Sequence, residues 1–290
     1  GASKGEGLGN KFLSHIREVD AIVQVLRHFQ DSDIVHVEGE VDPLRDREII
    51  NTELIFADLE HIEKVLPNLQ KRAKIAQNKE DKKVAEILEK IQKVLMEGKL
   101  ANTIKEDFSD EELKLIKSYN FLTLKPFVYA LNIAQEDIQN AEKLKAEFEA
   151  KLQAPVAIVC VKLEAEMMSF SSEERNEFLT ELLEIWGNQV PTLDDLIALA
   201  FNQLGLMYYF TTGEKETRAW TVPLNSTAPQ AAWAIHSDFE RGFIKAEVIA
   251  TERLLECGSW SKAKEKGLVR LEGKEYIVQD GDVMIFKFNV

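Results

Sequence analysis

Two stretches of the chain repeat apolar residues at alternating spacings of four and three positions, which is the spacing of a helix seam. The first series is Ile55, Leu59, Ile62, Leu66 and Leu69, and the second is Val84, Leu88, Ile91 and Leu95. The polar run from Gln77 to Asp81 separates them and contains no apolar residue. We therefore expect an antiparallel coiled-coil hairpin as an insert over residues 51–119, with its turn near Asn78.

Short apolar runs on both sides of this insert indicate strands. They cover residues 21–29, 127–132 and 155–161, and a helical pattern from about 135 to 152 separates the last two. Strand, helix and strand in this order are typical of a βαβ unit, whose strands are parallel and covered on both faces. Residues 1–50 and 120–204 are therefore expected to form one α/β domain around the hairpin.

The segment from Gly205 to Val290 differs in pattern and in charge. Short strand-like runs alternate there with glycines that mark turns. The whole chain has 36 Lys and Arg against 50 Asp and Glu, a net charge of -14, but this last segment is close to neutral. Both changes predict a separate α+β domain of ubiquitin-like size over residues 205–290.

Charge and composition also exclude classes of function. A net charge of -14 repels a polyanion, so sequence-specific DNA binding is not expected. The two cysteines and five histidines show no metal-ligand spacing, so no metal site is expected within the chain. No signal sequence and no apolar span long enough for a bilayer appears. We expect a soluble, cytoplasmic protein without membrane contact.

The opening residues GASKGEGLG place Gly5, Gly7 and Gly9 ahead of a helix that is expected to begin near Asn10. Such a mobile loop can present backbone amides to phosphate at the start of a helix. The phosphate-loop pattern GxxxxGK[ST] occurs nowhere in the 290 residues. Taken alone, the glycines are therefore open to two interpretations, a turn or part of a nucleotide site.

The opening string as a whole, GASKGEGLGNKFL, resembles the YchF/Obg-like ATPase family, in which it follows switch II directly. Further strings that resemble the family are IREVDAI at 16–22, INTEL at 50–54, FLTLKP at 121–126 and YIVQDGDV at 276–283. The resemblance implies an α/β fold: an incomplete P-loop NTPase of Obg type, with a coiled-coil insert and a C-terminal TGS domain. It implies hydrolysis of ATP, or of GTP, with Mg²⁺, and binding to the ribosome or to RNA through the TGS and helical domains.

The family's phosphate loop, switch I and magnesium ligands would lie before Gly1. Without them a chain lacks the groups that stabilise the transferred phosphoryl group, so we expect these 290 residues alone to be inactive. The alternative function is a noncatalytic module, in which the coiled coil and the TGS domain bind RNA or protein.

The resemblance also assigns residues that contact the base. Its base-recognition motif falls on Asn132, Ile133 and Gln135, and its base-contacting loop falls on Cys160, Val161 and Lys162. Gln135 replaces an acidic residue of the family, and its neutral amide can both donate and accept a hydrogen bond. The alternatives are a strand-end turn at Asn132 and, for residues 160–162, a buried strand end from which the Lys162 ammonium reaches the solvent.

Gln24 stands where the family often has a histidine that is proposed to assist the attacking water. A glutamine can orient water by hydrogen bonding, but it cannot act as a base. The alternative is a glutamine inside a strand without a catalytic task. Together with Gly5, Gly7 and Gly9 as nucleotide-binding residues, Gln24 completes the predicted site.

Overall fold

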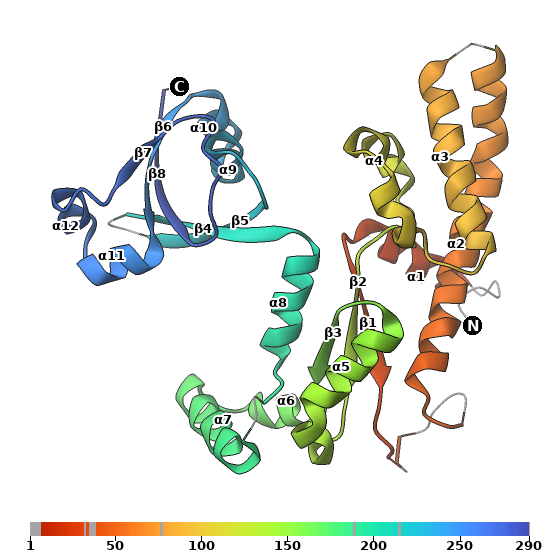
Figure 1. Cartoon of the computed structure of the whole chain (residues 1–290), viewed down its shortest axis with the longest axis horizontal. Helices are drawn as coiled ribbons and strands as arrows, with labels where there is room; N and C mark the ends of the chain where they lie inside the picture. The colour runs from red at the N-terminus through yellow and green to blue at the C-terminus, as the bar shows by residue number, and fades with distance from the viewer. Residues whose placement is uncertain are drawn as a thin grey trace. The chain divides into compact units, whose positions relative to one another are not determined.

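The chain forms two compact units, residues 1–200 and residues 201–290. Figure 1 shows them in a computed structural model that describes residues 7–31, 33–34, 39–75, 78–187, 190–213 and 216–289. The boundary between the units falls inside helix α8 (Leu193–Gln203).

A three-stranded parallel sheet forms the centre of the first unit. Its strands lie in the order β1 (Ile22–Arg27), β2 (Phe127–Asn132) and β3 (Val156–Val159). Helix α2 (Pro43–Ile75) packs against β1, and α5 (Ala141–Leu152) packs against β3. The predicted parallel pairing of the strands is confirmed. The carboxyl ends of all three strands therefore meet at one edge of the sheet.

Further helices and 3₁₀ turns surround this sheet. The helices are α1 (Gly7–Glu18), α4 (Asp110–Ile116), α6 (Val161–Met167) and α7 (Ser172–Trp186), and the 3₁₀ turns are η1 (Ala101–Asp107), η2 (Lys117–Tyr119) and η3 (Gln135–Asn140). Helix α1 begins at Gly7, so the predicted start near Asn10 is wrong. Gly7 and Gly9 therefore belong to the helix itself, while Gly5 lies outside the described residues.

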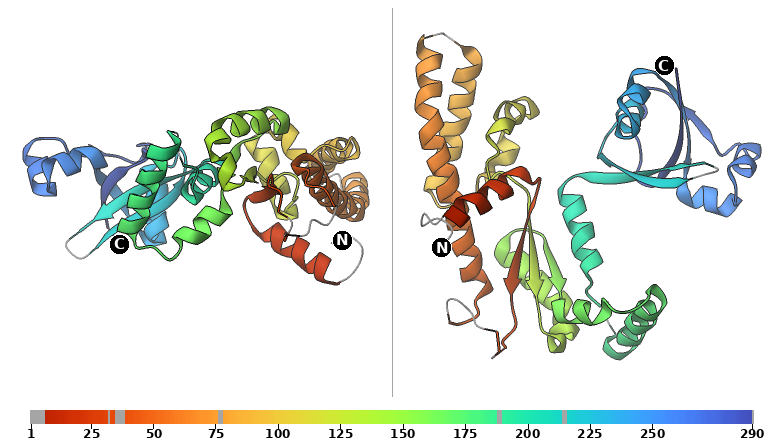
Figure 2. Two further views of the ribbon diagram at one scale, coloured as in Figure 1. Left: turned by 90° about the horizontal axis from the view of Figure 1, so that it is seen from below. Right: turned by 180° about the vertical axis from the view of Figure 1, so that it is seen from behind.

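The predicted helical hairpin is confirmed as helices α2 (Pro43–Ile75) and α3 (Lys79–Met96), which lie side by side (Figures 1 and 2). Their seam residues are buried against each other, with Ile62, Leu88 and Ile91 fully enclosed. At the tip, Arg72 of α2 donates two hydrogen bonds to Asp81 of α3, at 2.9 and 3.0 Å. Asn78 caps α3, at the predicted turn.

Helix α2 begins at Pro43, well before the predicted boundary at residue 51. The carboxylate of Asp42 accepts hydrogen bonds from the backbone N–H groups of Leu44 and Arg45, at 3.0 and 3.1 Å. Asp at the cap and Pro at the first helical position are both strong signals for a helix start. The first turns of α2 therefore belong to the contact with β1 rather than to the hairpin.

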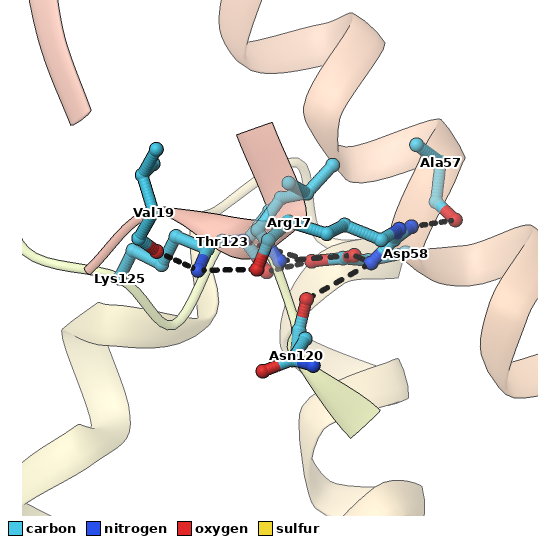
Figure 3. A network of polar contacts seen from close by, with 8 residues as sticks. Arg17, Val19, Ala57, Asp58, Asn120, Thr123 and Lys125 are labelled. Atoms are coloured by element: carbon cyan, nitrogen blue, oxygen red, sulfur yellow. Dashed lines mark hydrogen bonds and ion pairs between the residues drawn. The ribbon is translucent and has the colours of Figure 1, made fainter. Parts of the chain in front are cut away.

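A buried carboxylate joins the hairpin to the sheet (Figure 3). Asp58, in the middle of α2, has no exposed surface. Its oxygens accept hydrogen bonds from the backbone N–H of Leu122 at 3.1 Å, and from the N–H and hydroxyl of Thr123 at 2.8 Å each. Because both of these residues lie just before β2, Asp58 fixes α2 to the amino end of that strand.

Arg17, near the end of α1, completes this cluster (Figure 3). Its guanidinium donates to Asp58 at 2.9 Å and to the carbonyl oxygens of Ala57 and Asn120 at 3.1 Å each. The ammonium of Lys125 donates in turn to the carbonyl oxygens of Arg17 and Val19. Three segments far apart in sequence are thereby held together: α1, α2 and the loop before β2.

The second unit is a mixed five-stranded sheet with short helices. Its strands β4 (Leu206–Thr212), β5 (Thr217–Pro223), β6 (Phe243–Ala250), β7 (Arg270–Glu272) and β8 (Asp282–Phe288) lie in the order β5-β4-β8-β6-β7. The helices are α9 (Ala228–Ile235), α10 (Ser237–Arg241), α11 (Thr251–Cys257) and α12 (Trp260–Glu265). Tyr209 of β4 donates its hydroxyl proton to the carbonyl oxygen of Ala231, at 2.8 Å, which fixes α9 to the sheet. Within the ranges described, no helix combines the length and the apolar character needed to cross a membrane.

Replacing Asp58 by Ala is expected to lower the free energy of unfolding by about 3–5 kcal/mol, because the Arg17 guanidinium and two buried N–H groups lose their acceptor. Urea unfolding followed by circular dichroism measures the change. Glu63→Gln, at an exposed position of the same helix, serves as the control and should change the free energy by less than about 0.5 kcal/mol. Equal effects of the two substitutions would contradict a stabilising role for Asp58.

Candidate functional site

A cavity of about 490 Å³ opens at the carboxyl ends of the parallel strands. It is lined by residues that follow β1 (Phe29, Gln30, Asp31, Ile34), by the last residue of β2 and those that follow it (Asn132, Ile133, Ala134, Gln135, Glu136), and by the first turns of α6 (Val161, Lys162, Ala165). Ligands of open α/β sheets bind at this edge, and the volume is that of a small-molecule site.

Asn132 organises the cavity because it lies at the end of the central strand. Its backbone carbonyl accepts a hydrogen bond from the N–H of His28, which follows β1, at 2.8 Å. Its side-chain oxygen accepts from the N–H of Val161, at the start of α6, at 3.2 Å. One residue thus connects the segments that leave all three strands and fixes the two walls relative to each other.

Arg27, the last residue of β1, shapes the wall formed by Phe29, Gln30, Asp31 and Ile34. Its guanidinium donates to the carbonyl oxygens of Phe29 and Ile34 at 3.0 Å each and to that of Asp31 at 3.3 Å. The same guanidinium stacks over the Phe29 ring, 4.6 Å from the ring centre. A half-buried aromatic ring is thereby held at the rim of the cavity.

Gln135 and Glu166 form a polar pair beside the cavity. The Gln135 amide nitrogen donates to a carboxylate oxygen of Glu166 at 3.1 Å. The amide carbonyl oxygen accepts no hydrogen bond from any of the residues that the structure describes. The pair therefore fixes the Gln135 amide in an orientation that leaves its carbonyl oxygen free to accept a hydrogen bond.

The predicted base-contacting loop is divided by the fold. Strand β3 ends at Val159 and α6 begins at Val161, so Val161 and Lys162 lie on the first turn of a helix, exposed and in the cavity wall. Lys162 therefore reaches the solvent from a helix and not from a strand end, which corrects the alternative in that respect. Cys160, which lies between β3 and α6, is fully buried and does not line the cavity. Burial raises the pKa of its thiol, which makes it a packing residue behind the wall.

Gln24 does not reach this cavity. It lies within β1 with its side chain buried toward α2, where the amide nitrogen donates to the carbonyl oxygen of Arg47 at 3.4 Å. Gly7 and Gly9 lie in α1, whose opposite end is bound near the amino ends of the strands. The catalytic role predicted for Gln24 and the binding role predicted for the glycines thus remain predictions outside the observed cavity.

The cavity is lined by five of the residues that the family resemblance assigns to the base, and their binding role stays a prediction: Asn132, Ile133, Gln135, Val161 and Lys162. Sequence reasoning missed Arg27, Phe29 and Glu166. The strand pattern could have indicated Arg27 and Phe29, which lie at and just after the end of β1. The carboxyl ends of neighbouring parallel strands meet at the same edge of the sheet. Across the described ranges, no group of His, Cys, Asp or Glu side chains could hold a metal ion.

Comparisons with known proteins give a consistent result. The family YchF-GTPase_C, described as a protein of unknown function (DUF933), matches residues 206–289. The chain is 48% identical to the ribosome-binding ATPase YchF of Bacillus subtilis, over all of this chain and 79% of that protein. It is 50% identical to the ribosome-binding ATPase YchF of Haemophilus influenzae, over all of this chain and 78% of that protein.

A solved structure extends the match to three dimensions. The structure of the Schizosaccharomyces pombe YchF GTPase superposes with a TM-score of 0.82 at 36% identity, over 99% of this chain and 77% of that one. The expected α/β fold with a helical insert and a C-terminal β-sheet domain is thereby confirmed. Identity at this level over the full length of the chain leaves one conclusion: the protein belongs to the YchF/Obg-like ATPase family.

Proposed function

We propose that the cavity at the carboxyl ends of β1, β2 and β3 binds the base of ATP, and that the chain is the base-binding part of a ribosome-associated ATPase. The observation that supports this most is the hydrogen bond between Asn132 and Val161, which joins the two segments that the family resemblance assigns to the base. The names of the bacterial relatives support ATP and the ribosome as the ligand and the partner.

In this proposal the base lies between the Phe29 ring and the first turn of α6. An aromatic ring offers a stacking surface to any base, worth about 1–3 kcal/mol per stacked base. The exposed methyl groups of Val161 and the small Ala165 leave room on the opposite wall. The cavity therefore suits a flat, ring-shaped ligand.

The proposal prefers adenine over guanine because of the Gln135 pair. Glu166 holds the amide nitrogen, so the free carbonyl oxygen is an acceptor. Adenine offers an amino donor at the position where guanine has a carbonyl acceptor. An acceptor in the wall therefore attracts adenine and repels guanine, and GTP binds more weakly.

The family resemblance supports the following assignments for the domains, the partner and the metal ion. Residues 1–50 and 120–204 would form the nucleotide-binding domain, residues 51–119 the helical insert, and residues 205–290 a TGS domain. Contact with ribosomal RNA or protein would involve the insert and the TGS domain. Binding to the ribosome would place the protein in the cytoplasm. Mg²⁺ would accompany the nucleotide phosphates, because this ion is usually bound through substrate phosphates and one or two carboxylates. Hydrolysis of ATP is consistent with the name ATPase of the relatives.

Filling the cavity should block nucleotide binding. Ala165 lies exposed in the cavity wall, so Ala165→Phe adds a ring without disturbing the core and is expected to weaken binding of a fluorescent ATP analogue at least tenfold. The matched control is Ala146→Phe, at an exposed position of α5 outside the cavity, which should bind as the unaltered chain does. Equal affinities of the two variants, or no binding by the unaltered chain, would refute the proposed site.

Removing the acceptor should reduce the preference for adenine. Gln135→Leu is expected to lower the ratio of ATP to GTP affinity about fivefold, which corresponds to one hydrogen bond of about 1 kcal/mol. Glu166→Ala should act in the same direction, because the amide is then free to turn. Competition titrations with ATP and GTP measure the ratio, and Gln92→Leu on α3 is the control. An unchanged ratio in both variants would show that Gln135 does not discriminate between the bases.

A further inference from the structure

A second hollow of about 430 Å³ lies in the first unit, away from the carboxyl ends of the strands. It is formed by the 3₁₀ turn η1, helix α4 and the loop that leads into β2, at the amino end of the sheet. We call it the basic hollow, and its lining is Asp20, Lys105, Asp110, Leu113, Lys114, Ile116, Lys117, Asn120, Phe121, Leu124, Lys125 and Pro126. None of these residues lines the cavity at Asn132.

The charge of the basic hollow is opposite to that of the chain. Four lysines and two aspartates line it, although the whole chain carries a net charge of -14. Lys105, Lys114 and Lys117 are exposed and form no ion pair with the residues that the structure describes. Exposed lysines elsewhere do pair, as Lys64 with Glu60 and Lys151 with Glu147. Asp20 and Asp110 offset part of this charge, and the lining keeps a surplus of two lysines over aspartates.

The fourth lysine has a structural task. The ammonium of Lys125 donates to the carbonyl oxygens of Arg17 and Val19, and burial lowers its pKa. Asn120 accepts the hydrogen bond from Arg17. Lys125 adds charge to the hollow. Lys125 and Asn120 are not suitable for substitution, because both hold the end of α1.

The walls of the basic hollow are apolar. Ile116 and Phe121 are buried beneath it, and Leu113, Leu124 and Pro126 are half-buried. Lysines beside an apolar wall favour a ligand that has both an anionic and an apolar part.

We propose that the basic hollow binds a small organic phosphate, whose phosphate group meets Lys105, Lys114 and Lys117 while its apolar or aromatic part contacts Leu113, Leu124 and Pro126. A phosphate monoester carries a charge of about -1.5 to -2 at pH 7. This charge matches the surplus of lysines over aspartates better than the single charge of a carboxylate does. Lysine ammoniums also bind phosphate as point charges and need no paired geometry.

Calorimetric titration with phenyl phosphate tests the proposal, with benzoate and inorganic phosphate as matched probes. Phenyl phosphate is expected to bind at least tenfold tighter than benzoate and at least threefold tighter than inorganic phosphate. The double variant Lys114→Glu, Lys117→Glu should weaken phenyl phosphate at least tenfold. The control Lys71→Glu, Lys74→Glu changes two exposed lysines at the same spacing on α2 and should leave the affinity unchanged.

Three results would overturn the proposal. The first is no saturable binding of phenyl phosphate to the unaltered chain. The second is equal weakening by both double variants, which would mean that general charge attraction causes the binding. The third is equal affinity for phenyl phosphate and benzoate, because the phosphate group would then add nothing to the binding. These outcomes are independent of whether the cavity at Asn132 binds a nucleotide.

Discussion

The carboxylate of Asp58 is the interaction on which the arrangement of the first unit depends. A fully buried charge is costly unless every lone pair accepts a hydrogen bond. Here the Asp58 oxygens accept hydrogen bonds from two backbone N–H groups, a hydroxyl and the Arg17 guanidinium. The hairpin helix, α1 and the loop before β2 cannot separate without leaving that charge unpaired. This contact sets where the hairpin leaves the sheet, and it also fixes the strand that ends at Asn132.

The two ends of the sheet therefore have different tasks. At the amino end, side chains bind backbone and hold three segments in place, as Arg17 and Lys125 do. At the carboxyl end, Asn132 and Arg27 hold loops while the surface between those loops stays open. A rigid strand that is anchored at one end and carries loops at the other is a suitable support for a binding site.

Much of this was predictable from periodicity and strand order. The seams at Ile55–Leu69 and Val84–Leu95 predicted the hairpin, because a spacing of four and three fits only a helix face. The start of α2 was missed although Asp42 and Pro43 signal it, because no seam residue precedes Ile55. At the site, Asn132 and Val161 were found through a family resemblance, whereas Arg27 and Glu166 act through contacts with residues distant in sequence, and no local pattern records those. Gly7 and Gly9 were expected in a loop, yet the helix includes them.

The central claim is that the adenine ring lies in the cavity at the carboxyl ends of the strands, between the Phe29 ring and the first turn of α6. Nuclear Overhauser effects between adenine protons of bound ATP and methyl groups of the isotope-labelled chain measure this contact directly. The account predicts cross-peaks to the methyl groups of Ala134, Val161 and Ala165, which all line the cavity. Cross-peaks to other methyl groups, with none to these three, would contradict it.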